Sequence, residues 1–237
     1  MMIRRSICSA LVCTLALSML TGVAAAEEKA DKAAKKKGGK RNVTSLFDGK
    51  TLKGWKKTNF GGEGEVEVKD GNLMLHVGSD LTGVTIADGT KLPTNNFELS
   101  CEAQRVDGSD FFCGMTFPVH KGHCSLILGG WGGGVCGISC LDGADASENE
   151  TTFYREFKKG QWYKVKVRVT DNEMKAWIDG KEIFTVEDLK TRKIDTRIEV
   201  DLTKPLGFCT WQTSAALRNI EVRRFVNKQV KAAGKTE

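Results

Sequence analysis

The chain has 237 residues, enough for one domain with extensions or for two small domains at most. Its 40% hydrophobic content and its three prolines exclude a disordered or collagen-like chain. The formal net charge is +6, but the excess lies at the two ends, because residues 43–226 hold 24 basic and 26 acidic residues. This distribution excludes a basic nucleic-acid-binding fold, so we expect no nucleic-acid partner.

The first segment, residues 1–26, has the pattern of a signal peptide. A short positive region with Arg4 and Arg5 precedes an apolar run over residues 7–20, and three alanines end the segment before Glu27. The apolar run is short for a bilayer span of about 20 residues, although a membrane anchor is the alternative. We therefore expect an exported protein, periplasmic or extracellular, with no transmembrane span after signal removal.

Two further end segments lack the pattern of a folded domain. Residues 27–42 are rich in Lys, Ala and Gly without apolar periodicity, which predicts a flexible basic linker. A polybasic contact with an acidic surface is the alternative for this segment. Residues 227–237 are expected to form a polar C-terminal tail, so the folded domain is predicted over residues 43–226.

Two β-hairpins are predicted within this domain. Asp-Gly pairs between alternating segments are a strong hairpin signal, because both residues tolerate positive φ. One hairpin is predicted over residues 65–77 with its turn at Asp70-Gly71, and another over residues 174–186 with its turn at Asp179-Gly180.

The rest of the domain shows the same two-residue period, and no window sustains a helical apolar stripe over ten residues. Further strands are predicted near residues 83–87, 97–104, 111–117, 123–128, 134–140, 163–169, 205–211 and 215–225. So many short strands predict a single all-β domain, either a sandwich or a barrel.

Six short motifs follow one another along this domain, at residues 45–55, 68–73, 96–99, 160–163, 177–181 and 216–222. In this order they resemble the exported 3-keto-disaccharide hydrolase domain family over about residues 44–226. The resemblance implies a concanavalin A-like (laminin G-like) antiparallel β-sandwich of jelly-roll type. Trp55, Trp162 and Trp177 match fold-defining positions of the family, so we expect them in the core.

The middle of the chain departs from the family pattern. Residues 108–117 replace the usual Asn-Ser-Gly segment, and the Glu and Gln of a sugar-facing strand become Cys124 and Leu126. The motifs therefore support the fold of the domain more strongly than they support an enzymatic activity.

The resemblance implies cleavage of a glycoside that carries a ketone at C3. A base removes the C2 proton, a cation or hydrogen-bond donor stabilises the enediolate, the C1 substituent leaves, and water adds back. The candidate catalytic residues are His123, Asp110 and Asp107, with His120 as a substrate-binding residue near His123. For His120 and His123 the alternative is that both are solvated loop residues.

A glycine-rich segment, residues 129–134, surrounds Trp131 with five glycines. Such a segment leaves the indole free to stack on the C–H face of a sugar ring. The alternative is a tight crossing where glycines make room for neighbouring strands. Trp211 and Gln212 are predicted to supply a second substrate-binding wall.

An acidic stretch presents Asp142, Asp145 and Glu148 at intervals of three residues. These carboxylates are candidates for a divalent metal site for Ca²⁺ or Mn²⁺, and a solvated acidic loop is the alternative. The six cysteines after the signal segment are either buried thiols or members of disulfides.

Two functions therefore remain open, both with a carbohydrate or modified sugar as the partner. The first is an exported hydrolase or lyase that cleaves 3-keto-glycosides. The second is a non-catalytic glycan-binding or extracellular interaction module on the same fold.

Overall fold

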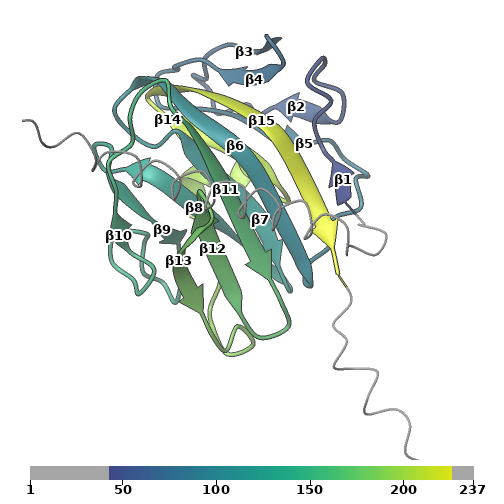
Figure 1. The fold of residues 1–237 in the computed structure, drawn as a ribbon, viewed down its shortest axis with the longest axis vertical. Coiled ribbons are helices and arrows are strands. Elements are labelled where there is room, and N and C mark those ends of the chain that lie inside the picture. The colour runs from purple at the N-terminus through teal and green to yellow at the C-terminus, as the bar shows by residue number, and fades with distance from the viewer. Residues whose placement is uncertain (1–42, 226–237) are drawn as a thin grey trace, which may run out of the picture. The chain divides into compact units, whose positions relative to one another are not determined.

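The structure, a computed structural model, describes residues 43–225. Within them, fifteen strands form two antiparallel sheets that pack face to face, and one short 3-10 helix, η1(Ile198–Thr203), lies outside the sheets (Figure 1). The predicted signal peptide 1–26, linker 27–42 and tail 227–237 fall outside the described residues. In the described part, no helix has the length and apolar character needed to cross a membrane.

The first sheet has eight strands in the order β13-β12-β11-β6-β15-β4-β3, with β1 paired to β15 beside this path. Two twelve-residue strands, β6 and β15, pair along most of their length and form its centre. The strands are β1(Val43–Ser45), β3(Val66–Lys69), β4(Asn72–Leu75), β6(Phe97–Gly108), β11(Trp162–Val169), β12(Met174–Ile178), β13(Lys181–Val186) and β15(Thr213–Arg224).

The second sheet has seven strands in the order β10-β9-β8-β7-β14-β5-β2. Its centre, β7 and β8, pairs in register from Cys113–Leu128 to Val119–Gly122. The strands are β2(Trp55–Lys57), β5(Leu81–Ile86), β7(Cys113–Val119), β8(Gly122–Gly130), β9(Val135–Ser139), β10(Phe153–Tyr154) and β14(Gly207–Trp211).

Both predicted hairpins are confirmed. β3 and β4 are joined at Asp70-Gly71, and β12 and β13 are joined at Asp179-Gly180. The aspartates have φ of 50° and 53°, the left-handed conformation that such turns require. The jelly-roll sandwich expected from the sequence is therefore the observed architecture.

The main core lies between the two sheets. Alternate residues of facing strands enter it, for example Leu99 from β6, Val165 from β11, and Phe117 and Leu126 from β7 and β8. Burial of this apolar surface is the dominant favourable term in folding, at roughly 25 cal/mol per Å².

The three tryptophans expected in the core divide into two groups. Trp55 is buried, and its indole N–H donates a 2.7 Å hydrogen bond to the carbonyl of Leu46. Trp162 and Trp177 are only half-buried on the outer face of the eight-stranded sheet, so their core prediction is wrong. The reason is the two-residue period, which turns the neighbours Tyr163 and Ile178 inward and both indoles outward.

The six described cysteines are free thiols, five of them buried. Burial raises the pKa of the Cys136 thiol to about 12, so the group is inert at neutral pH. The sequence left two alternatives for these cysteines, buried thiols or disulfides, and the structure has them as thiols.

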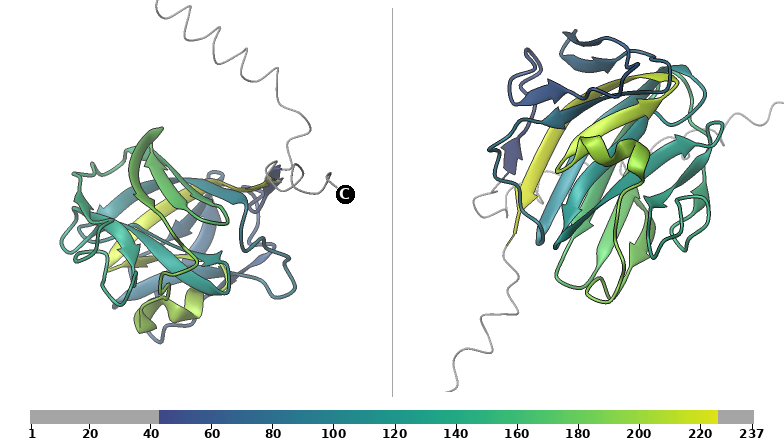
Figure 2. Two further views of the ribbon diagram at one scale, coloured as in Figure 1. Left: turned by 90° about the horizontal axis from the view of Figure 1, so that it is seen from below. Right: turned by 180° about the vertical axis from the view of Figure 1, so that it is seen from behind.

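The seven-stranded sheet is covered on its outer side as well. Helix η1 lies against β5 and β14 on this side (Figure 2). There the hydroxyl of Thr203 pairs with Thr116 at 2.7 Å, and Thr116 pairs with Ser125 at 2.7 Å. The fold thus has a second, smaller interior outside the sandwich, and this interior positions the candidate site.

Candidate functional site

The second interior is an apolar cluster on the outer face of the seven-stranded sheet. Along β8, Leu126 and Leu128 enter the main core, whereas Ile127 points to the opposite face. There Ile127 joins buried side chains from β5, β14, η1 and two loops. The members are Leu81, Phe111, Ile127, Ala146, Val200 and Cys209, with Phe60 and Trp211 packed against them.

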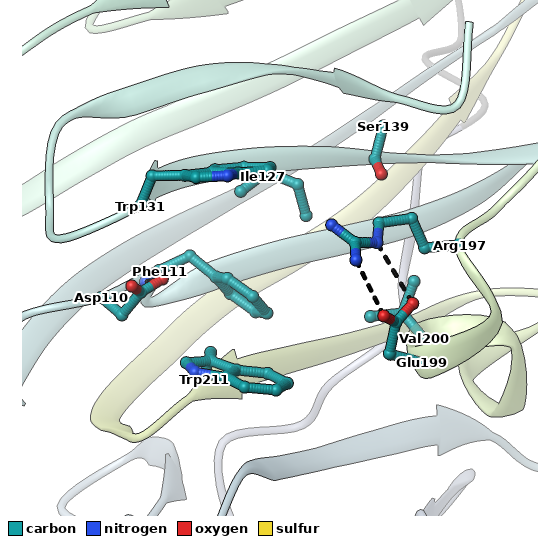
Figure 3. A pocket seen from close by; sticks show the side chains of 9 residues that line it. All are labelled: Asp110, Phe111, Ile127, Trp131, Ser139, Arg197, Glu199, Val200 and Trp211. Atoms are coloured by element: carbon teal, nitrogen blue, oxygen red, sulfur yellow. Dashed lines mark hydrogen bonds and ion pairs between the residues drawn. The ribbon is translucent and has the colours of Figure 1, made fainter. Parts of the chain in front are cut away.

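A pocket of about 220 Å³ opens above this cluster (Figure 3). Aromatic and aliphatic side chains form most of its wall, and charged groups stand at two sides of it. The residues that line it are Asp110, Phe111, Ile127, Trp131, Ser139, Arg197, Glu199, Val200 and Trp211. A mostly apolar pocket with a few convergent polar groups is the usual form of a small-molecule site.

Two indoles border the pocket from different segments. Trp131 lies in the loop between β8 and β9, has φ of 50° and is 47% exposed. Trp211 ends β14 and is half-buried, and its backbone N–H donates to the Phe111 carbonyl at 3.0 Å. Figure 3 shows both indoles on the same side of the pocket as Phe111, away from Arg197. The predicted convergence of Trp131 and Trp211 is therefore present.

Asp110 stands beside these aromatic side chains, and the backbone fixes its carboxylate. Oδ1 accepts the N–H of Phe111 at 2.7 Å, and Oδ2 accepts the N–H of Gly132 at 2.9 Å. The Asp110 N–H in turn donates to the hydroxyl of Thr213 at 3.0 Å. The carboxylate thus joins the β6–β7 loop to the Trp131 loop, and each oxygen keeps further acceptor capacity.

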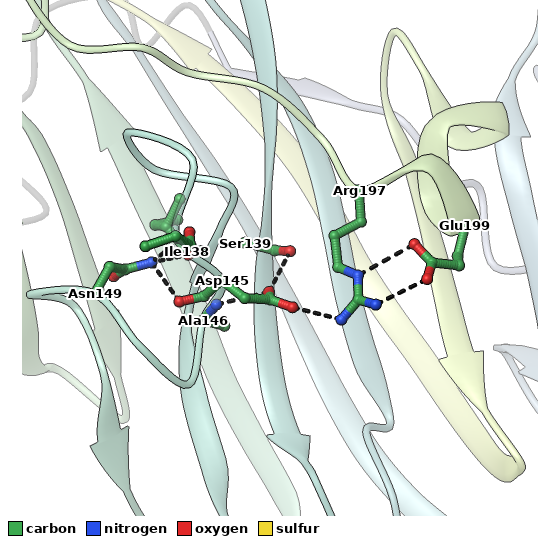
Figure 4. Close-up of polar contacts among 8 residues, drawn as sticks. Ile138, Ser139, Asp145, Ala146, Asn149, Arg197 and Glu199 are labelled. Atoms are coloured by element: carbon green, nitrogen blue, oxygen red, sulfur yellow. Dashed lines mark hydrogen bonds and ion pairs between the residues drawn. The ribbon is translucent and has the colours of Figure 1, made fainter.

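An ion-pair group stands at the other side of the pocket. Arg197 donates to both carboxylate oxygens of Glu199, at 2.8 and 3.1 Å, and also to Oδ2 of Asp145 (Figures 3 and 4). The bond from Arg197 lowers the pKa of Glu199, and the same bond is the main cause of the raised pKa of Arg197. Three of the five guanidinium N–H groups are used, which leaves two without a partner within residues 43–225.

Asp145 is held from its own side of this group (Figure 4). Its Oδ1 accepts the Ser139 hydroxyl at 2.8 Å and the Ala146 N–H at 2.7 Å. The Asn149 amide ties the same loop to β9 through the Ile138 carbonyl at 2.7 Å. Asp145 therefore orients Arg197, and it is engaged as an ion-pair partner.

The three predicted metal ligands do not meet. Asp142 pairs with Arg192 at 2.6 Å and accepts the Lys193 N–H, which is the main cause of its lowered pKa. Asp145 pairs with Arg197, and Glu148 is exposed. Within residues 43–225, no group of three or more His, Cys, Asp or Glu side chains is arranged to hold a metal ion. These residues do not fit the predicted Ca²⁺ or Mn²⁺ site.

Two other predicted residues belong to the neighbouring loops and not to the pocket lining. Asp107 is exposed and pairs with Lys159 at 2.7 Å, and this bond lowers the pKa of its carboxyl. Gln212 follows Trp211 but donates to Asp80 at 3.2 Å. Sequence proximity to Asp110 and Trp211 placed both in the prediction, although neither side chain lines the pocket.

The predicted histidines also lie apart from the pocket. His123 shares its face of β8 with Ile127, but four residues of strand separate the two by about 13 Å. Burial lowers the pKa of His123, and Lys204 lowers it further. His120 lines a different cavity with Lys121 and Lys190.

Sequence reasoning missed Arg197 and Glu199. Both belong to the segment around η1, which lies about 50 residues beyond the acidic stretch in the sequence. An arginine and a glutamate two apart in a polar segment form no recognisable motif. The packing of Val200 in the second apolar cluster and the ion pair of Arg197 with Asp145 bring them to the site.

Comparison with known proteins agrees with this architecture. The family described as 3-keto-alpha-glucoside-1,2-lyase-like domain matches residues 42–223. No curated protein sequence matches the chain. Among solved structures, a protein from Parabacteroides distasonis ATCC 8503 described as a glycosyl hydrolase is similar, with a TM-score of 0.50 and 19% identity over 84% of this chain and 97% of the other.

A second similar structure is the Crh5 transglycosylase in complex with NAG. Its TM-score is 0.53 and its identity is 10%, over 78% of this chain and 85% of the other. At such identities the likeness establishes the fold and says nothing of individual site residues.

Proposed function

Because the chain belongs to the 3-keto-alpha-glucoside-1,2-lyase-like domain family, we propose that the pocket between Trp131, Trp211 and Arg197 binds and cleaves a 3-keto-glycoside. The family match supports a carbohydrate-active or carbohydrate-binding protein. The particular bond and the particular residues are our proposal.

The size and lining of the pocket support a single sugar ring as the bound unit. Its volume of about 220 Å³ is below the range of about 300–1,000 Å³ that is usual for drug-sized ligands. The indoles of Trp131 and Trp211 offer flat apolar surfaces for the C–H face of the ring, and Asp110 and Arg197 offer partners for its oxygens.

The proposed reaction begins with proton transfer. Asp110 takes the proton from C2, which the C3 ketone acidifies, and the C–H electron pair forms the enediolate. The ketone then re-forms, a C1–C2 double bond appears, and the C1–O bond breaks with its electron pair going to the departing oxygen. The proton on Asp110 is available to that oxygen, so no further reactant is needed for this elimination.

Arg197 has the second role in this proposal. Its two N–H groups that have no partner within residues 43–225 stabilise the negative charge that develops on O3 in the enediolate. Glu199 and Asp145 hold the guanidinium in place and keep it charged. Addition of water across the new double bond would complete a net hydrolysis.

The observation that carries this proposal is the presence of a backbone-held carboxylate, a cation and two indoles around one pocket. The test is to incubate the purified protein with p-nitrophenyl 3-keto-α-glucoside or 3-keto-trehalose and to follow product release. We expect turnover of the 3-keto compounds and none of the unoxidised glycosides. Absence of turnover of either 3-keto compound would contradict the enzymatic proposal.

One observation favours the second candidate, a glycan-binding module without catalysis. Both carboxylates that line the pocket already have partners. Asp110 accepts two backbone N–H groups, and Glu199 is paired with Arg197. Measurable binding of trehalose by calorimetry, together with no turnover of 3-keto-trehalose, would favour this function.

The proposed site of action is outside the cytoplasm. Residues 1–26 support it by their signal-peptide pattern, which leaves a mature chain that begins at Glu27. N-terminal sequencing of the protein recovered from its source is the test, and an intact Met1 would contradict export by this signal.

A further inference from the structure

Arg105 is a buried cation beneath the candidate site. It lies near the end of β6, and only 5% of its surface is exposed. Its guanidinium is near the rings of Phe112 and Phe157, with its central carbon 5.1 and 6.0 Å from their centroids. Arginine is rarely buried to this degree without a partner.

The partners of Arg105 are backbone carbonyls. Nη2 donates to Asp110 at 3.0 Å and to Gly129 and Gly133 at 3.1 Å each. Nη1 donates to Phe157 at 3.3 Å, and Nε has no acceptor within residues 43–225. One guanidinium thus joins the residue that carries the pocket carboxylate to both ends of the loop that carries Trp131.

The glycines of this loop make room for that guanidinium. A Cβ built on Gly129 would lie 2.3 Å from Nη2 of Arg105. A Cβ on Gly133 would lie 2.8 Å from the Ser109 carbonyl, and φ of 120° at this residue is itself open only to glycine. The close-approach alternative for the glycine-rich segment therefore applies to Gly129 and Gly133, while Trp131 faces the pocket.

Removal of the guanidinium would leave several carbonyls without a donor in a region closed to water. An unsatisfied buried acceptor costs about 1–3 kcal/mol, so the loop would rearrange to find water or other donors. The loop would then keep the bond from the Gly132 N–H to Asp110 and the backbone bond from the Arg155 N–H to the Gly134 carbonyl at 2.9 Å.

We infer that Arg105 is a positioning residue that fixes the Trp131 loop and the Asp110 backbone at the spacing the pocket needs. Its consequence for sugar binding rests on the proposed function, whereas its control of the Trp131 loop does not. The loop is therefore the object of the test, and no sugar is required.

The experiment is ¹⁹F NMR of the protein labelled with 5-fluorotryptophan. The chain has five tryptophans, so five resonances are assigned by single Trp→Phe substitutions. In Arg105→Met, which keeps an unbranched side chain but removes the guanidinium and all of its donors, we expect the Trp131 resonance to shift or broaden. The resonance of Trp177, on β12 and two strands away from β6, should remain unchanged.

Arg105→Lys is the second variant, in case the first does not fold. Lysine keeps the charge but has one nitrogen, which cannot reproduce the planar fork that reaches carbonyls of two segments. We again expect a change at Trp131. Val167→Ala is the matched control, because it removes buried volume from the main core on β11 without contact to the loop.

An unchanged Trp131 resonance in a folded Arg105→Met or Arg105→Lys protein would overturn the inference. A change of the same size at Trp131 in Val167→Ala would also overturn it, since the effect would then follow from general destabilisation. If the proposed function holds, KM for p-nitrophenyl 3-keto-α-glucoside should rise at least about tenfold in Arg105→Lys, a loss of about 1.4 kcal/mol in binding. Failure of the sugar assay in the wild type would leave the ¹⁹F result intact.

Discussion

The outer faces of the two sheets use tryptophan in opposite ways. On the eight-stranded sheet, the Trp162 ring lies under Arg218 at 4.0 Å and the Trp177 ring under Lys166 at 4.1 Å. On the seven-stranded sheet, Trp131 and Trp211 border a pocket, and neither has a cation over its ring within residues 43–225. Tryptophans covered by the protein's own cations are structural, whereas uncovered ones beside a pocket are available to a ligand.

The strands beneath these faces differ in the same way. Strand β11 alternates buried and more exposed residues, whereas every residue of β7 is buried. The face of β7 that an isolated sandwich would turn to solvent is covered by η1 and the adjoining loops. A sheet face becomes a candidate site here because additional segments close over it and leave a gap.

The largest expected effect is the loss of the proposed base. In Asp110→Asn, kcat for p-nitrophenyl 3-keto-α-glucoside should fall by about 10²–10⁴-fold, the usual contribution of general acid–base catalysis. Asp107→Asn is the matched control, because Asp107 is exposed and paired with Lys159, and its kcat should change less than about twofold. Equal kcat values for the two variants would remove Asp110 from the proposed chemistry.

The role of Asp110 as the base can also be tested without cleavage of a glycosidic bond. The analogue 3-keto-1,5-anhydroglucitol carries no glycosidic oxygen at C1, so a base that removes its C2 proton leads to exchange of that proton with solvent and not to release of an aglycone. In D₂O the wild type should accelerate exchange at C2 over the spontaneous rate, and Asp110→Asn should not.

A smaller effect is expected from the tryptophans. Trp131→Ala or Trp211→Ala should weaken binding of 3-keto-1,5-anhydroglucitol at least about tenfold by calorimetry, which corresponds to about 1.4 kcal/mol. Both proteins should stay folded, because Trp131 is 47% exposed and Trp211 half-buried.

Trp162→Ala provides the control for the comparison of the two faces. It removes an indole of the same size that Arg218 covers, so sugar affinity should remain at the wild-type value. An equal loss of affinity in Trp162→Ala would mean that the uncovered indoles have no special role.

The smallest effect concerns the ion pair at the pocket edge. Arg197 lowers the pKa of Glu199 in the folded state, so the pair stabilises the protein fully above the ordinary glutamate pKa of about 4.3 and loses its effect as pH falls through the lowered value. Glu199→Gln should therefore lower Tm at pH 7 by a few degrees at most, because partly exposed pairs contribute about 0.2–1 kcal/mol. The difference from wild type should disappear in strong acid.

Glu148→Gln is the control for this titration. Glu148 is exposed and makes no ion pair within the described residues, so the Tm of Glu148→Gln at pH 7 should match that of the wild type. A constant difference between Glu199→Gln and wild type down to strong acid would contradict the role given to the pair.

The sequence was sufficient for the fold and for one side of the site. Two-residue periods and Asp-Gly turns predicted most strands, because both signals depend on neighbours in the chain. Trp131 and Asp110 could be found because glycines and a family segment mark them. Such signals come from residues that are close in the sequence, so they can be recognised without knowledge of the fold.

The other side of the site depends on contacts between distant segments. Arg197 reaches the pocket because Val200 packs in one cluster with Ile127 and because Asp145 pairs with the guanidinium, and no local pattern contains either contact. His123 lies apart from the pocket for a related reason, since its place beside a predicted strand does not give its distance along that strand from the other site residues. Trp162 and Trp177 were assigned to the core from family positions, although the alternation of β11 and β12 turns them outward.

The most direct test of the account is a crystal structure of the protein with 3-keto-1,5-anhydroglucitol bound. We predict one sugar ring between Trp131, Trp211 and Arg197, with C2 facing the carboxylate of Asp110. A ring bound over Trp162 and Trp177, or one whose C2 faces away from Asp110, would contradict the account.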